Sequence, residues 1–220
     1  AAARRVATGG LSLAGRLTRP DRTLGEAIHY VRSLQRVLAG PPVAGSPLLQ
    51  GRSMSWRFVA HEVPLQDLRA AAKSAGGSLN DAFLAALLGA FRRYHEHFDT
   101  PIASMPIAIP ISLRAGDDPM GGNRIAGARF AAPVGERDPR ERIRLIREFV
   151  VTARAEPAID AMSLIAPALS RLPAPLLTQL TGGFTQSNDL QASNIPGIAR
   201  PAYLAGARIT HMYPFGPLPG

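Results

Sequence analysis

The sequence has no cysteine in its 220 residues, which excludes disulfide bonds, thiolate metal sites and a cysteine nucleophile. No run reaches the roughly 18 consecutive apolar residues of a membrane-spanning helix. The first residues lack the apolar stretch and cleavage site of a signal peptide, so none is expected. The chain also lacks a phosphate-binding loop, a dinucleotide-binding fingerprint and a Gly-x-Ser-x-Gly nucleophile elbow.

Aromatic residues are scarce, and lysine is almost absent. Aromatics account for 6% of the chain, and all but one of the 25 basic residues are arginine, the exception being Lys73. The net charge of +9 suits nucleic acid, an anionic membrane surface or an anionic ligand such as coenzyme A. Because basic and aromatic residues are not interleaved, no nucleic-acid partner is expected.

Apolar residues are plentiful, at 46% of the chain against 19% charged. This length and composition predict one large domain or two small ones with a substantial core, and they exclude intrinsic disorder. The chain starts without methionine and closes on a turn-like run over Tyr213–Gly220. We therefore interpret both ends as interrupted.

Apolar periodicity predicts the order of the elements. Helices are expected over residues 23–39, 65–75, 79–98 and 138–154, with one or two more over 158–182. Strands are expected over 54–63, 105–113, 125–134, 184–195 and 202–212. Pro106 and Pro110 cannot donate ladder hydrogen bonds, which predicts an edge or bulged strand over 105–113. Asp138 is the expected N-cap of the last well-defined helix, and its charged residues at four-residue spacing predict a solvated face.

Asn80 and Asp81 open the apolar helix over 79–98. Ser78-x-x-Asp81 has the spacing of a capping box, and Asn80 could cap the helix instead. Capping is the favoured role of Asp81. The alternative is functional: the helix N-terminus faces a cleft, where its amides or Asn80 orient a substrate.

Other candidate residues follow the ends of two predicted strands. Ser112 and Arg114 precede a loop that contains Asn123, and Arg114 either pairs with a carboxylate or lies free on the surface. Ser193-Asn194-Ile195-Pro196-Gly197 is a turn, in which Gly197 suits a positive φ and the polar residues bond to local backbone, or form part of a site.

Histidines cluster at the end of the same apolar helix. On a helix, His95 and His97 would point apart, which argues against a metal site formed with Asp99. A histidine near a helix C-terminus is favoured by the helix dipole, and this is the expected role here.

Taken in order, these segments resemble the C-terminal half of the bacterial wax ester synthase/diacylglycerol acyltransferase family. The resemblance covers residues 45–220. It rests on Ser46-Pro47-Leu48 with Gly51, Val63-Pro64-Leu65, Asn80–Leu84, Gly89–Tyr94, Ile109–Arg114, Gly122-Asn123, Asp138-Pro139 with Arg142, Ser193–Gly197, Tyr203–Ala207 and Met212-Tyr213-Pro214. No single segment is specific, whereas the ordered set is.

The resemblance implies an α/β (α+β) fold with a mixed sheet flanked by helices, one half of a chloramphenicol-acetyltransferase-like acyltransferase. It implies transfer of a long-chain acyl group from acyl-CoA to diacylglycerol or a fatty alcohol, with no cofactor besides that substrate. In the family, the general base belongs to a His-His-x-x-x-Asp-Gly motif in the first half. That motif is absent here, because Tyr94 precedes His95 and Thr100 follows Asp99.

The chain is therefore expected to be the C-terminal portion of an O-acyltransferase with no catalytic residue of its own. Residues 1–44 would form a linker and helix, and residues 45–220 an incomplete acyltransferase domain. The expected partner is an N-terminal half or another chain, with an apolar contact face around 79–98 and 102–113. A cytoplasmic location is expected, with peripheral contact to the inner membrane or lipid inclusions left open. The alternative is a non-catalytic module that binds acyl-CoA, lipid or a partner.

Overall fold

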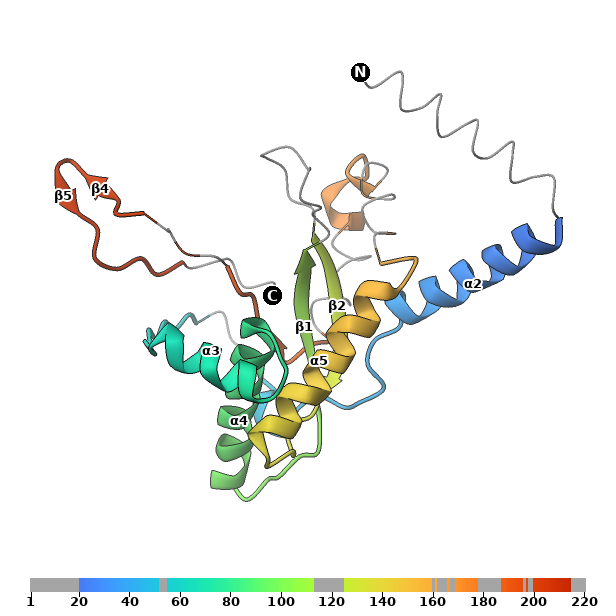
Figure 1. Ribbon diagram of the computed structural model, residues 1–220. Coiled ribbons are helices and arrows are strands. Elements are labelled where there is room, and N and C mark those ends of the chain that lie inside the picture. Colours follow the sequence, from blue (N-terminus) through green and yellow to red (C-terminus); the bar gives the residue numbers. More distant parts are fainter. Residues whose placement is uncertain are drawn as a thin grey trace.

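The computed structural model describes residues 20–51, 55–112, 125–159, 161, 166, 169–177, 187–195, 197 and 200–214. In chain order its elements are α2 (Pro20–Leu38), the short 3-10 helix η1 (Pro47–Leu49), α3 (Leu65–Ser74), α4 (Leu79–His97), β1 (Met105–Ser112), β2 (Ile125–Ala132), α5 (Pro139–Ala155), β3 (Leu190–Gln191), β4 (Tyr203–Leu204) and β5 (Ala207–Arg208). Figure 1 shows their arrangement. None of the described helices is long and apolar enough to cross a membrane.

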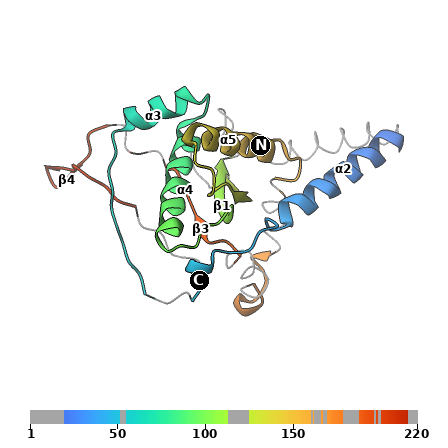
Figure 2. The same ribbon diagram turned by 90° about the horizontal axis from the view of Figure 1, so that it is seen from below.

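The core lies where α4 and α5 pack on each other and on the sheet (Figures 1 and 2). Both helices bury apolar residues at helical spacing: Ala82, Leu84, Ala85 and Leu88 on α4, and Ile143, Ile146 and Val150 on α5. Phe130 of β2 stacks on Phe149 of α5, with ring centroids 4.0 Å apart. Such periodic burial is the main source of stability for helices of this length.

The three-stranded sheet is mixed, with the order β2-β1-β3. β1 and β2 pair antiparallel along their whole length, from Met105 opposite Ala132 to Ser112 opposite Ile125. β3 pairs parallel to β1 over two residues only, with Leu190 opposite Ile107. The predicted α/β class, a mixed sheet flanked by helices, is confirmed.

The prediction that residues 105–113 form an edge or bulged strand was wrong, because β1 is the central strand. On the side facing β3, the carbonyls of Pro106 and Ala108 accept hydrogen bonds from Asp189 and Ala192. Backbone polar groups of alternate residues point to the same side of a strand, so Pro106 and Pro110 also face β3. Because neither proline faces β2, the hydrogen-bond ladder between β1 and β2 loses no N–H donor. β3 pairs with β1 only at Ile107 and Ala108, so neither proline lies in that pairing.

Several predicted boundaries also change. Residues 54–63 form no strand in the described part from residue 55 onward, because no neighbouring strand pairs with them. Of the expected strand over 184–195, the described residues 187–195 form a strand only at β3, and the expected strand over 202–212 is replaced by the small hairpin of β4 and β5. The helix predicted over 23–39 begins earlier, at Pro20. Of the expected helical stretch over 158–182, residues 160, 162–165, 167–168 and 178–182 lie outside the described residues.

Most large side chains of α4 and β1 belong to the core, but Tyr94 on α4 and its C-cap residue Phe98 are 43% and 51% exposed, so the expected apolar contact face in this region stays a prediction. Exposed apolar side chains also lie on α2 and on two segments that we call the apolar arms, residues 55–65 and 203–213. The second arm carries the β4–β5 hairpin, which projects away from the sheet (Figure 1). The arms meet where Tyr213 Oη donates to Glu62 Oε1 at 2.5 Å.

Candidate functional site

The N-terminus of α4 is built around Asp81, as the capping-box spacing predicts. The backbone N–H of Ser78 donates to Asp81 Oδ2 at 2.7 Å, and the Asp81 N–H donates to Ser78 Oγ at 3.3 Å. The Asp81 side chain is fully buried, and Arg147 Nη1 lies 3.6 Å from its Oδ2. The other carboxylate oxygen, Oδ1, has no hydrogen-bond partner in the described part of the chain. Capping is thus a role that the structure shows for Asp81.

Gly77 allows α5 to approach this helix end closely. A Cβ at Gly77 would lie 2.4 Å from Ile143 Cγ2, a distance that side chains do not tolerate. The close approach brings Arg147 of α5 towards Asp81. Asn80, next to it, remains half-buried.

The other candidates are positioned by the sheet. α4 and β1 run in opposite directions, so the N-terminus of α4 points to the end where β1 finishes (Figure 1). β3 is parallel to β1 and finishes at that same end. Ser112 ends β1, while Ser193 and Asn194 follow β3, and all three are exposed. Topology therefore assigns these residues and Asn80 to one end of the sheet.

The position of Gly197, Arg114 and Asn123 relative to this end of the sheet is not given by the strand order. Gly197 is exposed, three residues beyond Asn194. Arg114 and Asn123 lie outside the described residues, so the predicted pairing of Arg114 with a carboxylate stays a prediction.

A buried serine–histidine pair lies at the other end of α4. Ser46 Oγ is 2.7 Å from His95 Nε2, and His95 Nδ1 is 2.7 Å from the carbonyl oxygen of Phe91. A carbonyl only accepts, so Nδ1 carries the proton and Nε2 accepts from the Ser46 hydroxyl. The sequence predicted only a histidine stabilised by the dipole at a helix C-terminus, and the structure shows more. His95 is a fully buried residue with both ring nitrogens engaged.

Asp189 extends this pair to the sheet. Its Oδ2 accepts from the Ser46 N–H at 2.6 Å, and its own N–H donates to the carbonyl of Pro106 at 2.9 Å. Ser46 also caps η1 by accepting from the Leu48 N–H at 3.2 Å. A nucleophile must reach its substrate, whereas Ser46 and His95 are both buried. Their arrangement joins the 45–49 loop to α4 and β3.

Arg142 is a buried residue whose role the sequence did not reveal. The four-residue spacing from Asp138 predicted that Arg142 lies on a solvated face, but it is only 4% exposed. Its Nη1 donates to the Ala85 carbonyl at 2.8 Å, and its Nε and Nη2 donate to the Glu136 carbonyl at 3.1 and 2.6 Å. Burial, followed by the charge of Arg92, lowers the pKa of Arg142.

Gly89 makes room for this contact, because a Cβ there would lie 2.5 Å from Arg142 Nη1. The pairing of a glycine on α4 with an arginine on α5 was not readable from either helix alone. The two residues are 53 positions apart, and only the packing of the helices joins them.

All five histidines lie among the described residues, and none stands at the N-terminal end of α4. His29 is on α2 and His97 is exposed at the C-terminal end of α4. His61 and His211 belong to the apolar arms, where His211 Nε2 lies 3.3 Å from Glu62 Oε1. Across the described ranges, no group of three or more histidine or acidic residues could hold a metal ion.

Comparison with known proteins gives a consistent picture. Residues 121–220 match the family model of the WS/DGAT C-terminal domain. A Mycobacterium tuberculosis protein provisionally named a diacylglycerol O-acyltransferase is 47% identical over 216 residues, covering 97% of this chain and 43% of the relative. A second M. tuberculosis protein with the same provisional name is 31% identical over 171 residues, covering 72% of this chain and 36% of its own.

Among solved structures, the wax ester synthase/diacylglycerol acyltransferase from Marinobacter aquaeolei is similar at 23% identity and a TM-score of 0.45. The alignment covers 67% of this chain and 33% of that one. The chain thus spans less than half the length of these relatives.

Proposed function

The chain belongs to the wax ester synthase/diacylglycerol acyltransferase family, and on this basis we propose that it is the C-terminal portion of an O-acyltransferase. The donor is a long-chain acyl-CoA, and the acceptor is the hydroxyl group of diacylglycerol or a fatty alcohol. The observation that carries this proposal is the 47% identity to a relative provisionally named a diacylglycerol O-acyltransferase, over 97% of the chain.

The reaction needs a base, and none of the five histidines, all of which lie among the described residues, stands at the proposed site. The acceptor hydroxyl attacks the thioester carbonyl, a C–O bond forms, the C–S bond breaks, and the hydroxyl proton passes through a base to the leaving thiolate. His95 cannot serve, because it is buried and its Nε2 already accepts from Ser46. The base is therefore supplied by a histidine of another segment, in keeping with the family's His-His-x-x-x-Asp-Gly motif.

In this proposal the chain contributes polar groups that line one side of the acyl-transfer site. The N-terminus of α4 directs backbone N–H groups towards one end of the sheet, where they favour a developing negative charge. Asn80 stands at this helix end, and Ser112 and Asn194 follow β1 and β3 towards it. In this proposal Ser193, Gly197, Arg114 and Asn123 complete the cleft. Acyl-CoA is a substrate, and no further cofactor takes part.

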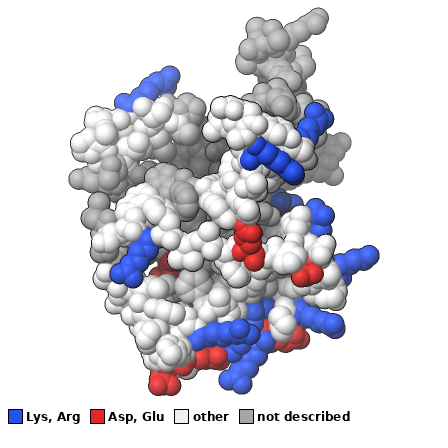
Figure 3. All heavy atoms as spheres, turned by 90° about the vertical axis from the view of Figure 1, so that its left-hand side faces the viewer, with Lys and Arg blue, Asp and Glu red and all other residues white. Residues whose placement is uncertain are grey.

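The apolar arms support the presence of a second polypeptide segment. Val59 is 90% exposed and Leu204 is 73% exposed, with Phe58, Tyr203 and Met212 more than half exposed. Figure 3 shows broad uncharged areas on the side that carries the arms, with charged residues gathered mainly towards the lower edge. Exposed apolar surface of this kind typically marks a protein–protein contact.

The test is acyl transfer measured with a long-chain acyl-CoA and diacylglycerol. We expect no turnover by the purified chain and measurable turnover when a family segment carrying the His-His-x-x-x-Asp-Gly motif is added. Replacing the second histidine of that motif should abolish the restored activity. Turnover by the chain alone, lost in His95→Ala, would contradict the proposal.

A second candidate function is a non-catalytic binding module, favoured by the exposed apolar arms. In that case the chain would bind acyl-CoA or a partner, yet the added segment would restore no activity. A monodisperse, monomeric chain that binds no hydrophobic dye would argue against this candidate. Isothermal titration with acyl-CoA, run beside the activity assay, separates the two candidates.

A further inference from the structure

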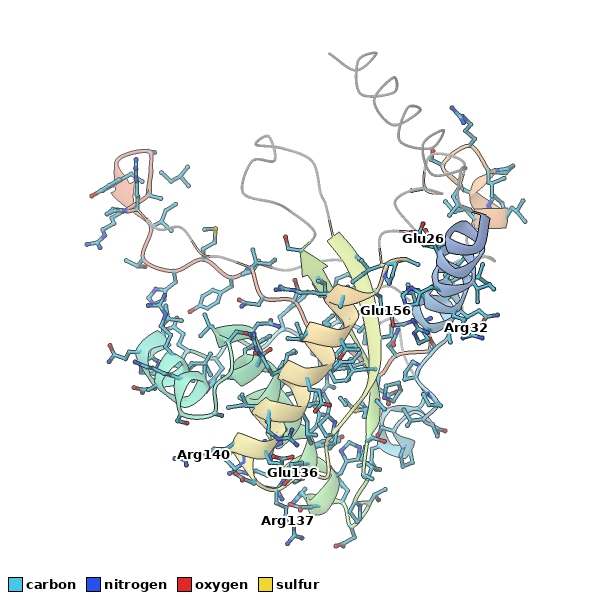
Figure 4. The ribbon with its side chains drawn as sticks, turned by 45° about the vertical axis from the view of Figure 1, so that its right-hand side comes forward. Glu26, Arg32, Glu136, Arg137, Arg140 and Glu156 are labelled. Atoms are coloured by element: carbon cyan, nitrogen blue, oxygen red, sulfur yellow. The ribbon has the colours of Figure 1, made fainter. Side chains whose placement is uncertain are left out.

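Helix α2 is attached to the rest of the molecule by its polar side. Ser33 is fully buried: its hydroxyl donates to Glu156 Oε2 at 2.6 Å and accepts from the Ala158 N–H at 3.0 Å. Arg36 donates two further hydrogen bonds to Glu156, at 2.7 and 2.8 Å. Figure 4 shows Glu156 beside the C-terminal part of α2. These contacts fix the rotation of α2 about its own axis, and therefore which of its sides faces outward.

The outward side carries a narrow stripe with a seven-residue repeat. Its members are Ile28, Val31, Gln35 and Leu38, spaced three, four and three residues apart. At 3.6 residues per turn, all four lie about 140–160° around the helix from Ser33. The three apolar side chains are 45%, 52% and 38% exposed, and Gln35 is exposed as well. This spacing gives the a and d positions of a heptad, the seam along which one helix packs on another in a coiled coil.

The position of α2 leaves this seam accessible to a second helix. Figures 1 and 2 both show α2 extending away from the sheet. The four side chains of the seam extend over residues 28–38, about 16 Å of helix. Stable protein–protein interfaces bury about 1,200 Å² or more, and a seam of this length buries less. We therefore expect a weak association that depends on concentration.

Gln35 distinguishes among the possible occupants of the seam. Against an apolar surface, its amide would lose hydrogen bonds to water without gaining others, which is unfavourable. A second copy of α2 in parallel orientation sets the two Gln35 side chains opposite each other, where each amide can both donate and accept. An antiparallel copy would set Gln35 against Val31 instead. The seam is thus complementary to itself in the parallel orientation.

The charges beside the seam are compatible with the same pairing. The flanking e and g positions, residues 25, 27, 32, 34 and 39, contain one charged residue, Arg32. In a parallel pair, an e position lies beside a g position of the other copy, so the two Arg32 guanidinium groups do not face each other. A strongly acidic or basic partner would find little charge to recognise here.

We propose that two copies of the chain associate through α2 as a weak parallel dimer, with Ile28, Val31, Gln35 and Leu38 of each copy in the seam. The interface uses the same surface on both copies, as two-fold symmetry requires. The anchor at Glu156 keeps this surface outward in each copy. This proposal is independent of acyl transfer, because association is measured without turnover and its failure would leave the activity assay unaffected.

The first experiment is sedimentation equilibrium of the full chain between about 5 and 200 µM, where a small interface should give a mixture of monomer and dimer. Val31→Asp should weaken dimerisation about tenfold or more, because it sets two carboxylates opposite each other in the seam. Val151→Asp is the matched control, since Val151 is also 52% exposed but lies on α5. It should dimerise like the unmodified chain. Gln35→Leu should tighten the dimer about tenfold, because a polar residue in the seam lowers stability.

Cross-linking tests the orientation, and it is easily interpreted because the chain has no cysteine of its own. In the parallel dimer, Val31→Cys places two thiols opposite each other, and oxidised glutathione should convert the dimer to a disulfide-linked form. In an antiparallel dimer each of these thiols would face Gln35. Val151→Cys should give no linked dimer under the same conditions.

Unchanged thermal unfolding would show that the variants at Val31 fold, and Ile28→Asp replaces Val31→Asp if that variant does not. A monomer at every concentration, a dimer that Val31→Asp leaves intact, or equal linkage in Val31→Cys and Val151→Cys would each overturn the proposal. A chain that stays monomeric but binds the added family segment through Val31 would assign this side of α2 to that segment instead.

Discussion

The central body and its periphery bury apolar surface in opposite ways. In the body, Leu84, Leu88, Ile107 and Ile146 are fully buried between α4, α5 and the sheet. At the periphery, α2 and the apolar arms leave their large side chains largely exposed, and polar contacts at Glu156 and Glu62 hold them in place. The body therefore has an apolar core of its own, whereas the periphery exposes apolar surface of the kind that contacts a partner.

The difference also separates two kinds of residue near the proposed site. Asp81, His95 and Arg142 are buried and satisfy backbone or neighbouring side chains. Asn80, Ser112 and Asn194 remain half-buried or exposed at one end of the sheet. Substitutions in the first set should change stability, and substitutions in the second set should change substrate handling.

The largest expected effect is in Arg142→Ala. The substitution leaves the carbonyls of Ala85 and Glu136 without their donor and creates a void beside Gly89. Loss of charge-assisted hydrogen bonds from a buried group should lower the free energy of unfolding by about 3 kcal/mol. Urea unfolding measures this. Arg144→Ala, an exposed arginine on the same helix, is the control and should leave the midpoint unchanged.

A smaller loss of stability is expected in Ser46→Ala, which removes the hydroxyl that is hydrogen-bonded to His95 Nε2. An unsatisfied buried acceptor should lower the free energy of unfolding by about 2 kcal/mol. Ser74→Ala, at an exposed position on α3, should have little effect. If Ser46 were instead a nucleophile, mass spectrometry after incubation with acyl-CoA would find an acylated serine that disappears in Ser46→Ala. We expect no such adduct.

The capping box should have a moderate effect. Ser78→Ala removes the oxygen that accepts from the Asp81 N–H, and should lower the free energy of unfolding by about 1 kcal/mol. Asn80→Ala should leave the unfolding midpoint unchanged but reduce acyl transfer in the reconstituted assay. A stability loss in Asn80→Ala equal to that of Ser78→Ala would show that Asn80 is structural and would erase the distinction between the two sets.

Local patterns predicted the helices of the body well. The apolar periodicity of α4, the Ser78 and Asp138 caps and the alternation of β1 are all properties of neighbouring residues. Contacts between distant residues were not predictable in the same way. Ser46 and His95 are 49 positions apart, and which side of β1 its prolines face depends on where β3 lies.

The same limit applies to the candidate site. The sequence identified Asp81 through its capping spacing, and Asn80 and Asn194 belong to the ordered motifs that carry the family resemblance. It did not reveal that Arg142 is buried, because its i and i+4 charges fit a solvated helix face equally well. Nor could periodicity show that α2 is attached by its polar side, since an amphipathic pattern does not say which side meets the body.

The smallest expected effect concerns the link between the body and α2. The hydrogen bond from Arg36, reinforced by that from Ser33, lowers the pKa of Glu156 in the folded protein. A lowered folded-state pKa means that the stabilisation is present above the unfolded pKa of about 4.3 and is lost as pH falls through the folded value. Glu156→Gln should therefore be slightly less stable than the unmodified chain at pH 7, and the difference should vanish in acid. Urea midpoints between pH 3 and pH 7 (about four values) measure this small ion-pair effect.

In Glu156→Gln, amide hydrogen exchange should become faster in α2 alone. Faster exchange in α4 or α5 as well would show that body and periphery unfold as one unit.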